Sequence, residues 1–350
     1  MPGLHTCKIF AAADGVDEYT TIAAWEADVD GELDMLEKGE CAAEVFDENV
    51  TITSSTTTSD YYMWLTSESG AEHDGRADEV SSAGNARIEG DTNLGVIYIY
   101  DEYTRVDWLE QYIDTDAAGV SLTVGSVSAC TIYVHHMLVH NNHKSSHAGN
   151  WGIYCGDVDA VMYVYRNITY GHGVNGIYAY RLAAGSQFFN NTIYENNFSE
   201  TAYRSGLGCN DADGTYYNNA CFQNPIVDIE DALGDNNYNA TGDGSCDGAN
   251  SITVVNYLDE LTAPSTTWAT CDLTIKDADA DIYQAGINAT DAGEGWADLP
   301  DFDVPISDRS ANMLTAGSWS MGADDIPAAA GGVVAISSFY ENTLFPFISC

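Results

Sequence analysis

Histidine residues are concentrated in one short stretch of this 350-residue chain. Five of the eight histidines fall within thirteen positions: His135, His136, His140, His143 and His147. His-rich tracts can bind transition metals. A β-strand, however, would place His135 and His136 on opposite faces, and His136 takes a position that Asn occupies in similar segments. We therefore favour turn and ladder histidines followed by a loop over residues 142–149. A metal site is the alternative, and its ligands are left unassigned.

Carboxylates are abundant, and glycoside hydrolysis needs two of them about 5–9.5 Å apart. Stacked segments in the middle of the chain could supply such a pair from six acidic residues: Asp157, Asp159, Glu195, Glu200, Asp211 and Asp213. Because the chain carries 54 acidic residues, some pair would meet this distance by chance. The sequence therefore predicts no specific catalytic or cofactor-binding residue.

One acidic run begins like a calcium-binding loop. Asp277, Asp279 and Asp281 alternate as in the first half of an EF-hand. The pattern fails at its sixth position, where Ile282 replaces Gly, and at its twelfth, where Asn288 replaces Glu. We expect no EF-hand and no dedicated cofactor, although Ca²⁺ could bind adventitiously to so acidic a surface.

The elements that would position these side chains come from a repeated segment. A polar pair, usually containing Asn, recurs inside a short β-rich run at residues 165–170, 189–194 and 217–222, with a looser copy at 134–139. Aligned positions lie 28, 31, 24 and 28 residues apart: Leu109, Met137, Ile168, Thr192 and Ala220. This period is typical of a solenoid in which each repeat is one coil.

A second series of segments recurs out of phase with the first, at residues 119–122, 152–155, 176–179 and 206–209. Two short phased strands per period, bounded by Gly, Asn, Asp and Ser, predict an all-β parallel β-helix. A propeller would need about 40–50 residues per blade, and the Leu lattice of a leucine-rich repeat is absent. Identical positions would stack about 4.8 Å apart, so that the Asn residues form ladders at the turns.

The nine cysteines form an odd set without metal-type spacing. Cys155 and Cys209 hold equivalent positions two coils apart, a separation of about 10 Å. That is too long for a disulfide, and we expect both to fill the core. Cys246 and Cys271 could pair, which the sequence leaves open.

Four regions follow from the pattern. Residues 1–94 would form an N-terminal cap and the first strands, with a short helix that begins at a Thr cap after Thr20. Residues 95–225 would form regular coils, and residues 226–326 irregular closing coils. Residues 327–350 combine a hinge with an unusually apolar segment, which would either mediate docking or oligomerisation or fold back as a cap.

The charge balance excludes several partners. Eleven Lys and Arg residues against 54 Asp and Glu residues give a net charge of −43 at pH 7. Nucleic acids and anionic membranes both require basic residues, so we expect neither as a partner. Such self-repulsion needs salt or cations to screen it, which indicates a saline or cation-rich setting; a dedicated acidic binding face is the alternative. No run of eighteen apolar residues predicts a membrane span, and we identify no signal peptide at residues 1–7.

Several segments resemble right-handed parallel β-helix proteins of the pectate-lyase-like superfamily: the central Asn segments and residues 19–26, 235–240, 250–253, 273–286, 301–303, 308–309 and 321–324. They are especially similar to uncharacterised marine bacteriophage structural proteins of the tail fibre or spike type. The resemblance implies a right-handed β-helix in a virion or extracellular setting, without enzymatic activity. It also implies a homotrimer that contacts other virion proteins and host cell-surface glycans.

Two other functions stay open. The first is a polysaccharide-degrading tailspike, acting as a glycoside hydrolase or a lyase, and the second is a secreted cell-surface adhesin. A lyase of this superfamily would need a base beside a calcium ion, from among Arg105, Arg166, Arg181, Arg204 and Lys144, and no acidic trio flanks Arg166. Four tyrosines are candidates for stacking on sugars: Tyr178, Tyr180, Tyr194 and Tyr203.

Overall fold

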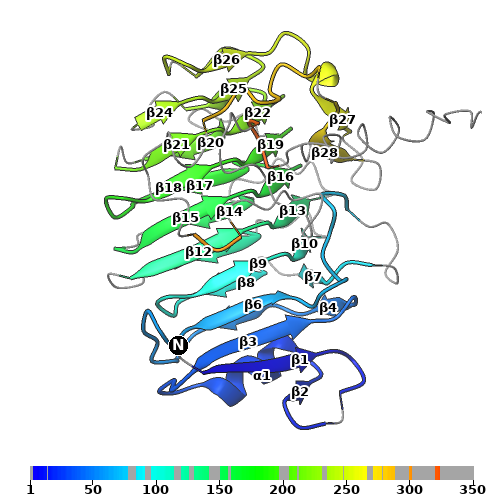
Figure 1. Ribbon diagram of the computed structural model, residues 1–350, viewed down its shortest axis with the longest axis vertical. Helices are drawn as coiled ribbons and strands as arrows, with labels where there is room; N and C mark the ends of the chain where they lie inside the picture. The colour runs from blue at the N-terminus through cyan, green and yellow to red at the C-terminus, as the bar shows by residue number, and fades with distance from the viewer. Residues whose placement is uncertain are drawn as a thin grey trace, which may run out of the picture.

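The computed structural model is a right-handed parallel β-helix, in which the chain winds through three long sheets (Figure 1). Strands of successive coils pair in parallel in all three sheets, which confirms the predicted fold class. The structure describes residues 3–13, 15–77, 84–90, 96–113, 120–125, 130–141, 150–156, 159–196, 205–210, 213–230, 235–246, 248–265, 271–277, 279–287, 299–301 and 320–323.

The three sheets are named here by size. Sheet 1 has the order β2 (Glu18–Tyr19), β1 (Leu4–Ile9), β3 (Leu36–Cys41), β6 (Met63–Ser67), β9 (Arg105–Asp107), β12 (Thr131–His135), β15 (Val161–Tyr165), β18 (Gln187–Phe189), β21 (Thr215–Tyr217), β24 (Asp235–Asn237). Sheet 2 has the order β26 (Ile252–Thr253), β25 (Ala240–Thr241), β22 (Ala220–Phe222), β19 (Thr192–Tyr194), β16 (Ile168–Tyr170), β13 (Leu138–Asn141), β10 (Glu110–Ile113), β7 (Arg87–Gly90), β4 (Val45–Asp47). Sheet 3 has the order β23 (Val227–Ile229), β20 (Ser205–Cys209), β17 (Ile177–Ala179), β14 (Ile153–Cys155), β11 (Leu122–Val124), β8 (Ile97–Ile99), β5 (Val50–Ile52).

The central region forms five consecutive coils of three strands each, from β8 to β22. The sequence predicted two strands per coil, because the Asn segment spans the end of one strand, a corner and the start of the next. The predicted alignment is also one residue out in its first two members. Leu138, not Met137, pairs with Ile168, and Glu110, not Leu109, pairs with Leu138.

The corner between sheets 1 and 2 has one backbone geometry in six coils. Its first residue lies in the left-handed region, with φ between 52° and 57°: Trp108, His136, Arg166, Asn190, Asn218 and Tyr238. Asn is enriched in this region because its short polar side chain tolerates it. His136 and Arg166 therefore occupy the corner position, and their predicted place in the Asn ladder is wrong by one residue.

The residue after the corner forms a buried Asn ladder, as predicted. Each Nδ2 donates to the Oδ1 of the next coil, at 3.0 Å from Asn167 to Asn191, 2.9 Å from Asn191 to Asn219, and 3.0 Å from Asn219 to Asn239. Each Oδ1 also accepts the backbone N–H of the preceding ladder residue. The ladder thereby satisfies backbone groups that the corner removes from the sheets.

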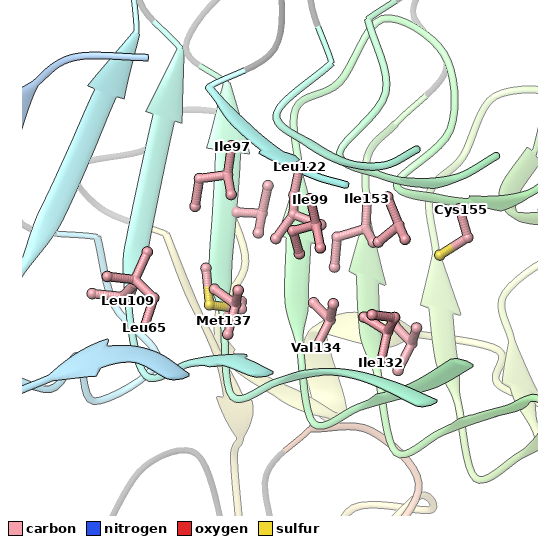
Figure 2. Packing of buried hydrophobic residues seen from close by; sticks show 14 of the residues in the cluster. Leu65, Ile97, Ile99, Leu109, Leu122, Ile132, Val134, Met137, Ile153 and Cys155 are labelled. Carbon is pink, nitrogen blue, oxygen red and sulfur yellow. The ribbon is translucent and has the colours of Figure 1, made fainter. Parts of the chain in front are cut away.

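Aliphatic side chains stack inside the coil and form the core (Figure 2). Ile97, Leu122 and Ile153 are in register on sheet 3. Cys155 and Cys209 are buried at equivalent positions two coils apart, as predicted. All eight cysteines in the described part of the chain are free thiols, so the Cys246–Cys271 pairing is not formed.

The helix α1 (Ile22–Val29) covers the N-terminal end of the core (Figure 1). Its Thr21 cap accepts the N–H of Ala24 at 3.0 Å, which confirms the predicted helix start. Ile22 and Trp25 are fully buried. Gly39 on β3 leaves room for the Trp25 ring, since a Cβ there would lie 2.8 Å from it.

The chain returns along the outer face of sheet 2 after the last coil. The 3₁₀ helix η1 (Tyr257–Asp259) leads into an antiparallel pair, β27 (Leu261–Ala263) and β28 (Asp272–Ile275), seen beside β16 and β19 in Figure 1. Leu261 and Leu273 pack there against buried residues of sheet 2, such as Ile168 and Phe222. This second apolar layer buries a sheet face that would otherwise meet solvent.

Two predictions concern the chain ends and the membrane. In the described part of the chain no helix is long and apolar enough to cross a bilayer. The hinge and apolar segment at 327–350 lies outside the described residues. The four-region division stays a prediction, and the strands of sheet 1 begin at Leu4 and continue to Asn237.

Candidate functional site

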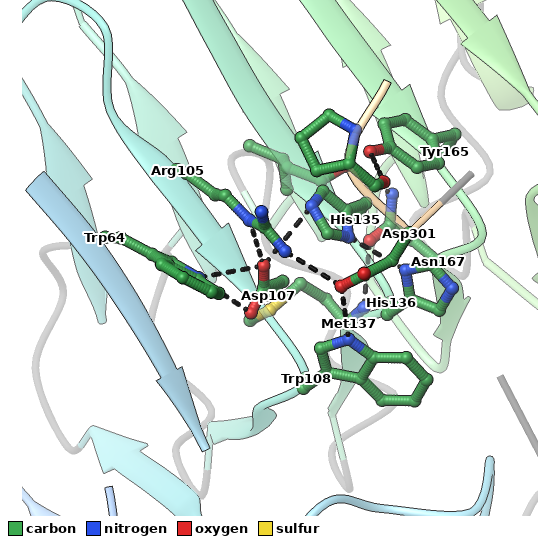
Figure 3. A network of polar contacts seen from close by, with 12 residues as sticks. Trp64, Arg105, Asp107, Trp108, His135, His136, Met137, Tyr165, Asn167 and Asp301 are labelled. Atoms are coloured by element: carbon green, nitrogen blue, oxygen red, sulfur yellow. Dashed lines mark hydrogen bonds and ion pairs between the residues drawn. The ribbon is translucent and has the colours of Figure 1, made fainter. Parts of the chain in front are cut away.

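The histidine pair lies in a buried polar cluster on the outer face of sheet 1 (Figure 3). β12 ends at His135, and His136 takes the corner conformation with φ of 52°. This turn brings the two rings together, with 2.8 Å between their Nδ1 atoms. The prediction that the two side chains lie on opposite faces is wrong, because the strand ends between them.

Asp107 is the centre of this cluster and is completely buried. It accepts hydrogen bonds from Trp64 Nε1, at 3.1 and 3.0 Å to its two oxygens, and from Arg105 Nε. His135 Nε2 lies 3.3 Å from Asp107 Oδ2. Strand register explains the convergence, since Trp64 pairs with Arg105 across β6 and β9, and Asp107 pairs with His135 across β9 and β12.

A segment from far along the chain closes the cluster. Asp301 Oδ2 accepts hydrogen bonds from Arg105 Nη2 at 2.8 Å and from Trp108 Nε1 at 3.4 Å. The Tyr165 hydroxyl donates to the carbonyl oxygen of Pro300. Figure 3 shows these groups facing one another over the end of β12. The returning chain is therefore fastened to sheet 1 at this point.

The cluster has metal-ligand types but already contains a cation. One ligand atom each from Asp107, His135 and Asp301 lies within 4.8 Å of the others. Burial opposes the charge on Arg105, yet the carboxylates of Asp107 and Asp301 raise its pKa above the usual value. Arg105 therefore stays protonated and cannot serve as a base. Because Asp107 and His135 are also 0% exposed, we interpret the cluster as a clamp, not as an active site.

His140 lies away from the clamp, on the outer face of sheet 2. Its Nε2 is 2.9 Å from Glu110 Oε1, and its ring stacks between Tyr112 and Tyr170, with centroids 5.1 and 5.2 Å away. Burial raises the pKa of Glu110, but its hydrogen bonds with His140 and Asn85 and the nearby Arg87 together outweigh burial and lower the pKa overall. The described histidines of the tract thus lie on two sheets: His135 and His136 at the end of a sheet 1 strand, and His140 on sheet 2. His143 and His147 lie outside the described residues.

Tyrosines form an accessible row on the outer face of sheet 3. We call Tyr98, Tyr100, Tyr154, Tyr178 and Tyr180 the tyrosine surface. Tyr98, Tyr154 and Tyr178 share one outward column, in which Thr123 separates the first two. Two ring pairs are near-parallel with centroids 6.0 Å apart, Tyr98 with Tyr100 and Tyr154 with Tyr178. Tyr100 is 44% exposed.

Two glycines let rings of this surface lie close to the coil. A Cβ at Gly125 would lie 2.2 Å from the Tyr100 ring, and a Cβ at Gly156 would lie 2.1 Å from the Tyr154 ring. The Tyr100 and Tyr154 rings therefore lie over the backbone at these glycines, and the Tyr154 ring also lies beside the rings of Trp151 and Tyr178. Partly exposed aromatic side chains of this kind can contact the apolar face of a sugar ring.

The structure separates the four tyrosines predicted to bind sugar. Tyr178 and Tyr180 belong to the tyrosine surface and are partly exposed. Tyr194 is 3% exposed under the returning chain, with its ring 5.8 Å from that of Tyr257, so its predicted role is wrong. Tyr203 lies outside the described residues. The sequence signal for the row was the Gly-Ile-Tyr phrase at 152–154 and 176–178.

The remaining charged candidates are dispersed. Asp159 and Asp213 are exposed and Glu195 is partly buried, and none of them belongs to the clamp. Arg166 is fully buried and donates from Nη1 to the carbonyl oxygen of Ala323 at 3.2 Å. Several candidates lie outside the described residues: Lys144, Asp157, Glu200, Arg204 and Asp211.

The acidic run at Asp277 lines an open pocket of about 490 Å³. Asp259, Glu260, Asp279 and Asp281 line the same pocket, together with Lys276, whose Nζ lies 3.7 Å from Asp259 Oδ1. In the described residues, these carboxylates are not among the groups of three ligand atoms within 4.8 Å. Adventitious Ca²⁺ binding stays a prediction.

Comparison with known proteins gives one structural likeness. No family model matches the sequence, and no curated protein matches it significantly. The crystal structure of pectate lyase Pel9A is similar over 92% of this chain and 97% of that chain, with a TM-score of 0.36 and 11% sequence identity. The lyase activity of Pel9A is a property of that protein, and it is not transferred to the present chain. The fold of the present chain rests on its own strand pairing.

Proposed function

We propose that this protein is a non-enzymatic, glycan-binding β-helix of the fibre or spike type. The tyrosine surface carries this proposal, because it offers partly exposed aromatic rings along an elongated scaffold, and two of them, Tyr154 and Tyr178, lie on neighbouring coils with centroids 6.0 Å apart. Aromatic rings at such spacing suit an extended carbohydrate chain, whose sugar units can stack on successive rings. Burial and the nearby Glu230 carboxylate raise the pKa of Tyr178 to about 12, so this phenol stays a neutral hydrogen-bonding group.

Charge selects the class of glycan. With a net charge of −43, the protein repels uronic-acid and sulfated polymers over the range of its field. Neutral oligosaccharides carry no such penalty. We therefore infer a neutral glycan as the ligand of the tyrosine surface.

Removing one ring tests the proposal. Tyr100→Ala should weaken binding of neutral oligosaccharides about tenfold, since one aromatic stacking contact contributes about 1–1.5 kcal/mol. Tyr100→Phe retains the ring and should bind within about threefold of the native protein. Binding is measured on an array of neutral and acidic glycans at high salt, followed by titration calorimetry.

Three outcomes would contradict the proposal. If Tyr100→Ala and the native protein bind glycans equally well, the tyrosine surface is not the glycan-binding site. A preference for acidic glycans would show that the net negative charge of the protein does not select neutral ligands. Release of shorter oligosaccharides from a bound polymer would instead support the polysaccharide-degrading spike.

The setting and assembly are part of the proposal and rest on the sequence resemblance. We infer a virion or extracellular location, a homotrimer and contacts with other virion proteins. A secreted adhesin would share the glycan ligand but not the particle. Light scattering of the purified chain, with and without residues 327–350, distinguishes a trimer that needs this segment from a monomer.

A further inference from the structure

A second cluster of metal-ligand side chains lies at the N-terminal end of the β-helix. His5 and Cys7 alternate along β1 and therefore point to the same side of the strand, and Glu37 on β3 is the direct partner of His5. One ligand atom from each of these three residues lies within 4.8 Å of the others. Cys7 and Glu37 are buried, and His5 is partly exposed at the rim.

One distance in this cluster is close to that between two ligands of a tetrahedral zinc site. Cys7 Sγ is 3.7 Å from His5 Nδ1 and 4.0 Å from His5 Nε2, so the ring has to rotate for Nδ1 and Sγ to share a metal ion. Zinc bonds of about 2.3 Å to sulfur and 2.0–2.1 Å to nitrogen place two tetrahedral ligands about 3.6 Å apart. His5 Nδ1 is 2.7 Å from Glu37 Oε2, a hydrogen-bond distance that would widen when a metal replaces the shared proton.

The other nitrogen of His5 has the partner that metal-bound histidines use. His5 Nε2 is 3.2 Å from Asp17 Oδ1. Ligating histidines typically donate their free N–H to a carboxylate, which fixes the ring and its tautomer. Asp17 thus holds the ring with Nδ1 towards Glu37, while Cys7 Sγ lies beside the ring.

We propose that His5, Cys7 and Glu37 bind a zinc-type divalent transition metal ion that fastens β1 to β3. Thiolate, imidazole and carboxylate together favour Zn²⁺ over Ca²⁺ or Mg²⁺. On binding, the Cys7 thiol and the His5–Glu37 pair each lose a proton to solvent, and three protein ligands leave a fourth position for water. No electron is transferred.

The cluster differs from the clamp on sheet 1 in one decisive way. In the clamp, Arg105 already bonds both carboxylates. In the N-terminal cluster the carboxylates of Glu37 and Asp17 both contact the His5 imidazole, and this imidazole can itself bind a metal ion when it loses its proton. No guanidinium has to be displaced.

Cobalt substitution tests the site on the full chain. Co²⁺ added to reduced protein should produce a thiolate charge-transfer band and tetrahedral ligand-field bands, and Zn²⁺ should abolish both. Cys7→Ser should lose the charge-transfer band. His5→Gln should lower the affinity at least about 100-fold, more than is typical for an outer-shell change. Cys246→Ser, which alters a partly exposed thiol elsewhere, should leave the spectrum unchanged.

X-ray absorption of the zinc-loaded native protein gives an answer that does not depend on folding of the variants. One sulfur at about 2.3 Å with nitrogen and oxygen neighbours is expected. A spectrum with oxygen neighbours alone, or a charge-transfer band that survives Cys7→Ser, would overturn the proposal. Glycan binding by the tyrosine surface does not depend on this site.

Discussion

Single residues in this protein take roles that depend on where the backbone turns. His135 and His136 are adjacent in sequence, yet the left-handed conformation of His136 lets their Nδ1 atoms lie 2.8 Å apart. Glu26 is a second case, because its helix places a carboxylate at the covered end of the core. There it accepts the N–H of Thr53 at 2.8 Å and is only 8% exposed.

Glu26 should make stability depend on pH. Burial, with repulsion from Asp30 and Asp101, raises the pKa of Glu26 to about 7. Since the folded pKa exceeds the unfolded value of 4.5, the folded state binds more protons. Stability from this group is therefore full below pH 4.5 and is lost as the pH rises through 7.

The matching substitution is Glu26→Gln, which retains an oxygen for the Thr53 N–H. It should raise the free energy of unfolding at pH 8 by about 1–2 kcal/mol and have little effect at pH 4.5. Urea unfolding at both pH values measures this difference, with Glu32→Gln on the exposed surface as the control. Equal effects at the two pH values would show that the charge of Glu26 is not responsible.

At the scale of elements, the corner and its ladder hold sheets 1 and 2 together. The corner residues also anchor the returning chain: Asn190 Nδ2 donates to the carbonyl oxygens of Ser320 at 2.9 Å and Gly322 at 3.1 Å. Asn218 bonds both the N–H and the carbonyl oxygen of Ile287. The outer corner positions and the inner ladder positions are thus adjacent residues with separate structural roles.

Asn191→Ala should strongly destabilise the protein. The change leaves the N–H of Asn167 and the carbonyl oxygen of Val164 without their partner in the ladder. Unsatisfied buried groups cost about 1–3 kcal/mol each, so a loss of about 2–4 kcal/mol is expected in urea unfolding. Asn250→Ala, at an exposed position, is the control and should change stability by less than about 0.5 kcal/mol. If Asn191→Ala lowers the free energy of unfolding by less than about 1 kcal/mol, water molecules replace the hydrogen bonds that the Asn191 side chain makes.

At the scale of the whole molecule, the net charge of −43 dominates. Three parallel sheets and the returning chain keep the acidic residues within one elongated particle, so their mutual repulsion opposes folding. Screening shortens the Debye length from about 10 Å at 0.1 M salt to about 3 Å at 1 M. The folded state should therefore gain stability with salt.

The melting temperature should rise by about 5 °C or more between 0.1 and 1 M NaCl and then level off, because screening is nearly complete at about 1 M. Differential scanning fluorimetry over this range measures the effect. An uncharged osmolyte of equal osmolality serves as the control and should not reproduce the curve below 1 M. A linear rise that continues beyond 1 M would indicate a general solvent effect in place of screening.

The sequence by itself determined the β-helix, the Asn ladder, the N-terminal helix and the core role of Cys155 and Cys209. These features follow from local periodicity, since every coil repeats the same chemistry at the same position. The exact register was out by one residue at Leu109 and Met137, where the Asn signal is missing.

Only the tertiary structure decided which side chains meet and which are accessible. The clamp joins Arg105 to Asp301, and Tyr194 is covered by Tyr257, because the returning chain lies against coils far away in sequence. His5, Cys7 and Glu37 converge through the pairing of β1 with β3. No local pattern encodes such contacts, since they depend on the path of the chain after its last coil and on the register between strands.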